Sequence, residues 1–440
     1  MNNRSFDISQ REFVFHAKPL SLTYVTSLTD NLYLNQLISG LLTLKDEKTL
    51  LEALINGSIE ITADVTRQEK MLLSGCSVID YEQQYYILET RSYPGRSISS
   101  PETEKSVRGA KDGFSENIIS NVGLIRRRIR DNRLVMAMFE VGKISKSDVC
   151  LAYIEGLADD SLLQVIQERL TKLNVDEIVM SDRALEEVML GQGYHPFPFV
   201  RYCERPDIVA AQLMKGDIAL IVDTSSSVIL LPITLLDLLQ HVEEHRETPF
   251  VGTVFRLVRM LAVILSIYLV PLWLAVIQTG ELNFRLFVKP ENFSMTSIVM
   301  QVFLVEGAIE LLRLATIYTP SALSSAMGLI AAILVGQMAI DLGMFTPEVL
   351  LYCAISNVAG YATPNYELGN ANKLVKWLMI IFVGLFGRYG FVTFHFMLLF
   401  YLAHLKVFNY DYFYPFIPFD GKKILQYIIR FPKRANKCRQ

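Results

Sequence analysis

The stretch from Val254 to Ile277 constrains the fold of this chain more than any other. Its sequence is VFRLVRMLAVILSIYLVPLWLAVI, and its only charged residues, Arg256 and Arg259, stand near its first end. An α-helix rises about 1.5 Å per residue, so about 20 apolar residues cross a hydrocarbon layer about 30 Å thick. A helix in the core of a soluble protein normally carries a polar stripe, which this segment lacks. The sequence therefore predicts a membrane span, with Trp273 near the far lipid–water boundary.

Charge divides the chain into two regions. Residues 251–440 hold 16 Lys and Arg against 9 Asp and Glu, whereas residues 1–250 hold 26 against 36. The net charges are thus +7 and −10. About 250 residues is more than one compact core usually needs, so the acidic region is predicted to contain two soluble units. Its first 15 residues lack the apolar core of a signal peptide, and the five cysteines show no repeated spacing, which predicts a reducing cytoplasmic location.

The acidic region contains an internal repeat. Leu22–Asp30 aligns without gaps with Leu151–Asp159, and each copy has a short strand pattern followed by an Asp that can cap the next helix. Later in each copy a helix pattern ends at Gly75 or Gly216, and a hairpin of apolar strands follows. These patterns predict two similar α/β subdomains. The alternative is two unrelated α/β pieces whose nine aligned positions match by chance.

An arginine-rich helix is predicted between the two copies, after a connector marked by Pro94, Gly95 and a run of serines. Its basic residues are Arg126, Arg127, Arg128 and Arg130. A charge run of this kind usually lies on a solvated face. The functional alternative is a docking surface for the acidic neighbouring unit, a partner subunit or lipid headgroups. No aromatic residues alternate with these arginines as a nucleic-acid platform requires, so no nucleic-acid partner is expected.

Several long motifs resemble one known family. The stretches SSPETEKSVRGAKDGFSENIISNVGLIRRRIRD, ISKSDVCLAYIEGLAD and FVRYCERPDIVAAQLMKGDIALIVDTSSSVILLP resemble the A subunits of GerA-type spore germination receptors. The stretch HVEEHRETPFVGTVFRLVRMLAVILSIYLVPLWL is similar to a sporulation paralogue within that family. The resemblance implies a protein of the inner spore membrane that acts in germination. It also implies a homo-oligomer such as a pentamer, which passes monovalent cations and has other small membrane subunits as partners.

An apolar segment with three charges follows the first span. Residues 294–314 carry Glu306, Glu310 and Arg313 on one helical stripe. Burying carboxylates in lipid is too costly for a lipid-facing span. The segment is therefore either an interfacial helix with an intrahelical Glu310–Arg313 pair, or one wall of a wet cavity. The family resemblance carries the same three residues and favours a functional role.

Two further membrane segments contain candidate functional residues. The span predicted at 321–340 is rich in small residues, which suits close helix packing or a pore wall. Its candidate pore residues are Val335, Gly336 and Gln337, with an interhelical hydrogen bond as the simpler role for Gln337. A break in the helix pattern follows a third span, and irregular backbone at this depth is tolerated only inside protein or beside water. It resembles the family signature at Pro364, Asn365, Tyr366 and Asn370, although Glu367 departs from that signature.

The segment 374–405 is too long for one straight span. Gly384, Gly387 and Gly390 cluster around Arg388, which predicts a tilted or kinked helix or two half-spans. Full crossings are predicted at about 254–277, 321–340, 347–363 and 374–402. The basic end of the chain is placed inside by the positive-inside bias. With the acidic region also inside, the number of crossings is even.

These segments predict an α/β cytoplasmic region of two similar subdomains, followed by an all-α polytopic membrane domain. In chain order they are a polar N-terminal arm (1–20), a first α/β subdomain (21–92), a connector with the arginine-rich helix (93–148), a second α/β subdomain (149–248), a membrane domain (249–408), and an aromatic band with a basic cytoplasmic tail (409–440).

No catalytic or cofactor motif supports an enzyme. The sequence has no phosphate-binding loop, no GxSxG and no Cys/His metal cluster, so no cofactor is expected. HVEEH at 241–245 fits the HxxEH zinc pattern, but it lacks an evident third ligand and leads directly into the first span. The favoured hypothesis is an oligomeric, membrane-embedded ion channel acting in spore germination, with the acidic stripe giving cation preference. The alternative is a ligand-sensing receptor or scaffold subunit without conductance of its own.

Overall fold

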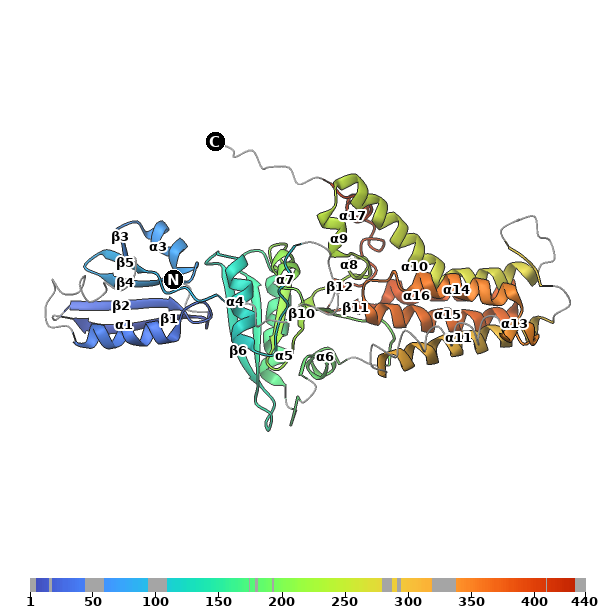
Figure 1. Ribbon diagram of the computed structural model, residues 1–440, viewed down its shortest axis with the longest axis horizontal. Coiled ribbons are helices and arrows are strands. Elements are labelled where there is room, and N and C mark those ends of the chain that lie inside the picture. Colours follow the sequence, from blue (N-terminus) through green and yellow to red (C-terminus); the bar gives the residue numbers. More distant parts are fainter. Residues whose placement is uncertain are drawn as a thin grey trace. The chain divides into compact units, whose positions relative to one another are not determined.

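The structure is a computed structural model that describes residues 5–15, 18–43, 59–93, 109–173, 175–178, 181–191, 194–278, 287–290, 294–318, 338–408 and 410–431. Its contacts divide the chain into two units (Figure 1). The α/β unit comprises Met1–Tyr194 and Phe199–Ile233, and the helical unit comprises His195–Pro198 and Thr234–Gln440.

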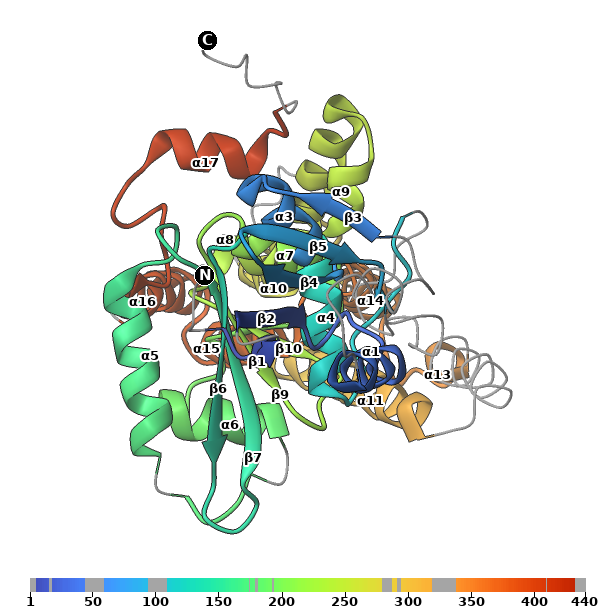
Figure 2. The same cartoon turned by 90° about the vertical axis from the view of Figure 1, so that its left-hand side faces the viewer.

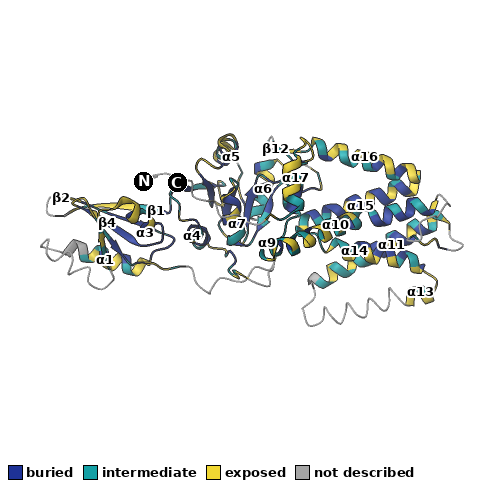
Figure 3. Ribbon diagram, turned by 90° about the horizontal axis from the view of Figure 1, so that it is seen from above, coloured by how far each residue is buried: buried dark blue, intermediate teal, exposed yellow. Residues whose placement is uncertain are grey.

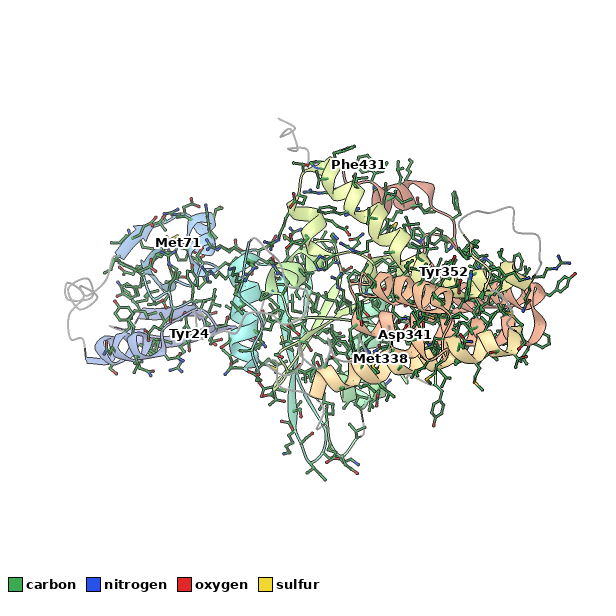
Figure 4. All side chains as sticks on the ribbon, turned by 45° about the vertical axis from the view of Figure 1, so that its right-hand side comes forward. Tyr24, Met71, Met338, Asp341, Tyr352 and Phe431 are labelled. Carbon is green, nitrogen blue, oxygen red and sulfur yellow. The ribbon has the colours of Figure 1, made fainter. Side chains whose placement is uncertain are left out.

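The first α/β subdomain is a five-stranded antiparallel sheet in the order β1-β2-β4-β5-β3. Its elements are β1 (Ile8–Phe15), β2 (Lys18–Val25), α1 (Asn31–Thr43), β3 (Ile59–Thr62), α3 (Val65–Leu72), β4 (Ser77–Tyr81) and β5 (Gln84–Leu88). Because side chains alternate along a strand, the sheet has two apolar faces. Leu34 and Leu37 of α1 pack on one face, and Leu72 of α3 packs on the other. Figure 4 shows Tyr24 and Met71 on these opposite faces.

The second subdomain repeats this strand order as β6-β7-β9-β10-β8. Its elements are α4 (Ile118–Arg128), β6 (Leu134–Val141), β7 (Ser147–Ile154), α5 (Asp160–Lys172), α6 (Ser181–Leu190), β8 (Arg201–Cys203), α7 (Pro206–Leu213), β9 (Ile218–Val222) and β10 (Val228–Leu231). The β6–β7 pair runs in register from Leu134 opposite Ile154 to Val141 opposite Ser147, and Figure 2 shows it as a long hairpin. A single apolar core joins α4 and α7 to this sheet.

The two copies match in strand register and in the conformation of one glycine, as well as in strand order. Leu22 lies opposite Ile79, and the aligned Leu151 lies opposite Leu220. Gly75 and Gly216 both have positive φ, 98° and 104°. A Cβ on either glycine would meet the carbonyl oxygen of an aligned residue, Leu28 at 3.1 Å or Leu157 at 2.6 Å. The two subdomains are therefore similar, as the repeat predicted.

Each copy also begins one strand earlier than the sequence pattern indicated. Strand β1 lies within the predicted polar arm, and β6 lies within the predicted connector 93–148. β1 is an edge strand whose Gln10, Arg11 and Glu12 are all exposed. It pairs with β2 through its backbone, so its side chains carry little of the apolar alternation by which strands are found in a sequence.

Replacing Gly216 with alanine is expected to destabilise the α/β unit. The new Cβ would stand 2.6 Å from the Leu157 carbonyl oxygen, at a φ of +104° that L-residues rarely adopt. We expect a loss of about 2 kcal/mol, measured as a lower unfolding temperature of the full chain. Gly156→Ala is the control, because its φ is +79° but nothing lies within 4 Å. If the two substitutions lowered the unfolding temperature equally, the close approach to the Leu157 carbonyl oxygen would not contribute to the destabilisation.

Within the described residues of the helical unit, two helical segments are long and apolar enough to cross a membrane. They are Pro249–Gln278, with a mean hydropathy of 2.6, and Tyr366–His404, with a mean hydropathy of 1.6. Its elements are α8 (Leu235–Leu238), α9 (Val242–Arg246), α10 (Pro249–Gln278), α11 (Met295–Tyr318), α13 (Ala339–Asp341), α14 (Pro347–Gly360), α15 (Tyr366–Phe386), α16 (Arg388–His404), β11 (Lys406–Val407), β12 (Tyr410–Asp411) and α17 (Gly421–Ile428). Most of the predicted span 321–340 lies outside the described residues.

The break predicted within 374–405 falls at Gly387. This residue has φ +60° and separates α15 from α16, which lie side by side (Figures 1 and 3). A Cβ on Gly387 would collide with Gln278, and a Cβ on Gly390 would collide with the Phe382 carbonyl group. Glycine therefore permits the tight turn and the close approach of the two helices. Arg388, just after the turn, lies over the ring of Tyr389.

Candidate functional site: a charged network between apolar helices

The contacts of α11 fix its direction against α15. Near the start of α11, Val299 lies where a Cβ on Gly384 would touch it, at 3.3 Å. Near its other end, the Arg313 guanidinium donates to the Tyr366 hydroxyl at 3.0 Å. The two helices are thus antiparallel. This direction brings the charged stripe of α11 against Lys373 and Lys376, which stand three residues apart and share one face of α15.

A buried ion pair lies near the middle of this contact. Glu306 Oε2 lies 2.7 Å from Lys376 Nζ, and the two side chains are only 3% and 2% exposed. Asn357 of α14 donates to Glu306 Oε1 at 2.9 Å, and the Trp377 indole donates to Oε2 at 3.4 Å. The Lys376 ammonium also donates to Ser356 Oγ at 3.4 Å. The pair therefore joins α11, α14 and α15, with each charge compensated inside one chain.

A second cluster of charged side chains, more exposed than the first, lies one turn further along α11. Glu310 accepts hydrogen bonds from Arg313 Nε at 2.9 Å and from Lys373 Nζ at 3.0 Å. These three side chains are 21%, 17% and 23% exposed. The intrahelical Glu310–Arg313 pair predicted from the sequence is present. The network as a whole holds two carboxylates against three cations, so it has no excess of negative charge.

The burial of Glu306 differs from both alternatives given for this segment, an interfacial helix and a wall of a wet cavity. Lys376 could not be predicted as its partner, because the two residues are far apart in the chain. The available signal was a pair of lysines within a predominantly apolar helix. Glu310 is the carboxylate that remains partly open to the surroundings of the chain.

The helix-break motif places one residue in this network. Tyr366 binds Arg313, whereas Asn365 caps α15 by accepting from the Leu368 backbone amide at 2.8 Å. Pro364 lies in the turn before α15, and Asn370 lies half-buried in its second turn. The remaining pore candidates, Val335, Gly336 and Gln337, lie outside the described residues.

The arginine-rich helix makes contacts mostly inside the α/β unit. Arg126 is fully buried, and its Nε and Nη2 donate to both Asp7 carboxylate oxygens, at 2.8 and 2.9 Å. Arg127 lies over the Tyr93 ring, and Arg128 pairs with Asp112. The interpretation of a uniformly solvated face is therefore wrong at Arg126, where burial needs a charged partner. Arg127 and Arg130 are exposed and remain docking candidates.

The HxxEH match at 241–245 has a structural role. Glu244 is fully buried and accepts from Arg256 Nε at 2.6 Å and from Arg259. His241 caps α9, its Nδ1 accepting from the Glu243 backbone amide at 3.3 Å. Among the residues that the structure describes, no three His, Cys, Asp or Glu side chains gather as metal ligands.

Cysteine thiols in the α/β unit lie within its apolar interior. Burial raises the pKa of Cys76 to about 11 and raises the pKa of Cys150 well above its ordinary value. Both thiols therefore stay protonated at neutral pH, and a protonated thiol is a poor nucleophile.

Comparison with known proteins finds one family across the full length. The family model "Bacillus/Clostridium GerA spore germination protein" matches residues 1–440, so the chain belongs to the GerA family. Among its relatives, Stage V sporulation protein AF of Bacillus subtilis (strain 168) is 39% identical over 99% of this chain and 91% of the relative. Spore germination protein KA of the same organism is 28% identical over 96% of this chain and 80% of the relative.

A crystal structure is also similar to part of the chain. It is the N-terminal domain of the A subunit of the Bacillus megaterium spore germinant receptor GerK3, with 26% identity and a TM-score of 0.39. The match covers 51% of this chain and 88% of that chain. The family model and the relatives confirm the predicted family, including the similarity to its sporulation paralogue.

Proposed function

We propose that this protein is an oligomeric ion channel of the inner spore membrane, which releases monovalent cations during germination. Several identical copies enclose the ion path, and other small membrane subunits are its candidate partners. The α/β unit and the C-terminal tail lie on the cytoplasmic side. The observation that carries this proposal is the partly exposed charge of Glu310, Arg313 and Lys373 on two predominantly apolar helices.

The positions of these charges within their helices support a watery neighbour. Lys373 lies about 10 Å along α15 from its first residue, and Glu310 lies about 12 Å from the last residue of α11. A charged side chain that faces lipid at the centre of a bilayer costs about 3 kcal/mol on insertion scales, and the cost falls toward the membrane surface. A water-filled seam between copies of the chain removes that cost. One chain with the four predicted crossings encloses little space, so the seam requires several copies.

The pairing within the network assigns different roles to its two carboxylates. Glu306, held by Lys376, positions α11 against α14 and α15 and does not line the ion path in this arrangement. Glu310 faces the path but is neutralised by Arg313 and Lys373. Cation preference therefore requires that Glu310 be freed from one of these partners. The paired arrangement corresponds to a closed state of the channel.

Conductance of the full chain in liposomes tests the proposal directly. We expect monovalent cation flux from the wild type and a smaller cation-over-anion permeability ratio from Glu310→Gln. The expected decrease is about fivefold, since one charge acts on an ion 4 Å away in water with about 1 kcal/mol. Glu168→Gln, which removes an exposed carboxylate of α5, is the control and should conduct as the wild type does.

The alternative function is a ligand-sensing receptor or scaffold subunit without conductance. It is favoured by the size of the α/β unit, whose two similar subdomains offer surfaces unrelated to an ion path. Correctly inserted, folded protein that gives no flux under any ionic gradient would support this alternative and exclude the channel.

A further inference from the structure

The C-terminal helix α17 presents apolar and basic side chains together on an open surface. None of its residues is buried, and Figure 3 colours it as exposed and intermediate. Apolar side chains around it are also exposed, among them Phe419 at 79% and Phe431, labelled in Figure 4, at 54%. We call this surface the α17 patch; its members are Phe416, Ile417, Phe419, Lys422, Lys423, Leu425 and Phe431.

The α17 patch is anchored at the start of α10. Arg256 Nη1 donates to the carbonyl oxygens of Gln426 and Tyr427, at 2.9 and 3.1 Å. The Arg430 backbone amide donates to Thr253 Oγ1 at 3.0 Å. The end of α17 is therefore fixed beside the first turns of a candidate membrane span, not on a mobile tail.

The position of these anchors sets the depth of α17. The charge-free run of α10 begins at Met260, about 6 Å beyond Arg256 along the helix. Each polar interfacial layer of a bilayer is about 5 to 8 Å thick. If the apolar run fills the hydrocarbon core, α17 lies within the layer of lipid headgroups.

The positive charge of the C-terminal stretch favours contact with anionic lipid. From Gly421 to Gln440 the sequence contains seven Lys and Arg and no Asp or Glu. On the described part of that stretch, Lys422 and Lys423 are exposed next to Leu425. Basic side chains beside exposed apolar ones are the pattern of helices that lie in the plane of an anionic membrane surface.

We propose that the α17 patch binds the anionic phospholipid surface of the membrane that α10 crosses. Leu425, Phe419 and Phe431 enter the boundary between headgroups and acyl chains, while Lys422 and Lys423 contact lipid phosphates. This inference rests on the proposed membrane placement, but it does not depend on conductance.

A fluorescent probe on the patch tests this binding in the full chain. In a Cys438→Ser background, whose other four cysteines are buried, Leu425→Cys is labelled with an environment-sensitive dye after reconstitution in nanodiscs. With phosphatidylglycerol present we expect blue-shifted emission, protection from aqueous iodide, and quenching by nitroxide placed near the headgroups. Gln426→Cys, the exposed neighbour on the polar side of α17, is the matched control and should stay open to iodide.

A second experiment removes the positive charge of the α17 patch. Changing Lys422 and Lys423 to glutamine should weaken membrane binding by about fivefold per lysine, and high salt should act in the same direction.

The proposal is overturned if the Leu425 probe is as accessible as the Gln426 probe, or if its protection is the same in purely zwitterionic lipid. Protection that persists in detergent without lipid would instead indicate a protein partner or a second copy of the chain. A protein that fails to conduct but shows lipid-dependent protection would overturn the channel and leave this inference intact.

Discussion

Replacing Lys376 with methionine is expected to destabilise the helical unit by about 3 to 5 kcal/mol, because it leaves the Glu306 carboxylate buried without its counter-charge. The measurement is the unfolding temperature of the full chain in detergent or nanodiscs. The double variant Glu306→Gln/Lys376→Met should recover most of the loss, since it removes the buried charge together with its partner.

A matched lysine on the same helix provides the control. Lys373→Met should cost less, because Glu310 keeps its bond to Arg313 and is 21% exposed. The role given to the Glu306–Lys376 pair would be untenable if Lys376→Met were as stable as the wild type. It would also be untenable if the double variant were no more stable than the single one.

The second large effect is expected at Arg126 in the α/β unit. Arg126→Met leaves the Asp7 carboxylate fully buried and unpaired, so we expect a loss of about 3 to 5 kcal/mol. Arg126→Lys should rescue little, because an ammonium cannot reproduce the two-pronged contact with both Asp7 oxygens. Thermal unfolding and proteolysis of the full chain both report this loss.

The exposed end of the same arginine run is the control for this substitution. Arg130→Met should change stability by no more than about 0.5 kcal/mol. If Arg126→Met and Arg130→Met behaved alike, the run would be a solvated charge stripe after all, and its buried contact with Asp7 would lack energetic significance.

The repeat could be predicted because its signals are local. Asp159 follows β7 after a four-residue connection and caps α5, and Gly216 stands at the point where the chain leaves α7 with positive φ. Strand β1 was missed because pairing at the edge of a sheet uses the backbone, and polar side chains such as Arg11 are acceptable there.

The candidate site was predictable only in part, for a different physical reason. Glu306, Glu310 and Arg313 share one helix, so their common face follows from the helical period alone. Their partners Lys373 and Lys376 belong to another helix, and the antiparallel contact that joins the two is a tertiary property. A stripe of carboxylates in an apolar segment therefore predicts that their negative charge is compensated. It does not predict whether water or a lysine side chain compensates it.

Arg256 links the start of α10 to residues near the end of the chain. Its guanidinium is shared between Glu244, which precedes the first long helix, and the last carbonyl groups of α17, near the opposite terminus. Deleting the final twenty residues would thus strip partners from a buried cation at the base of α10. Truncations that remove α17 to improve crystallisation would therefore destabilise the helical unit. A tag appended after Gln440 would leave the hydrogen bonds of Arg256 in place.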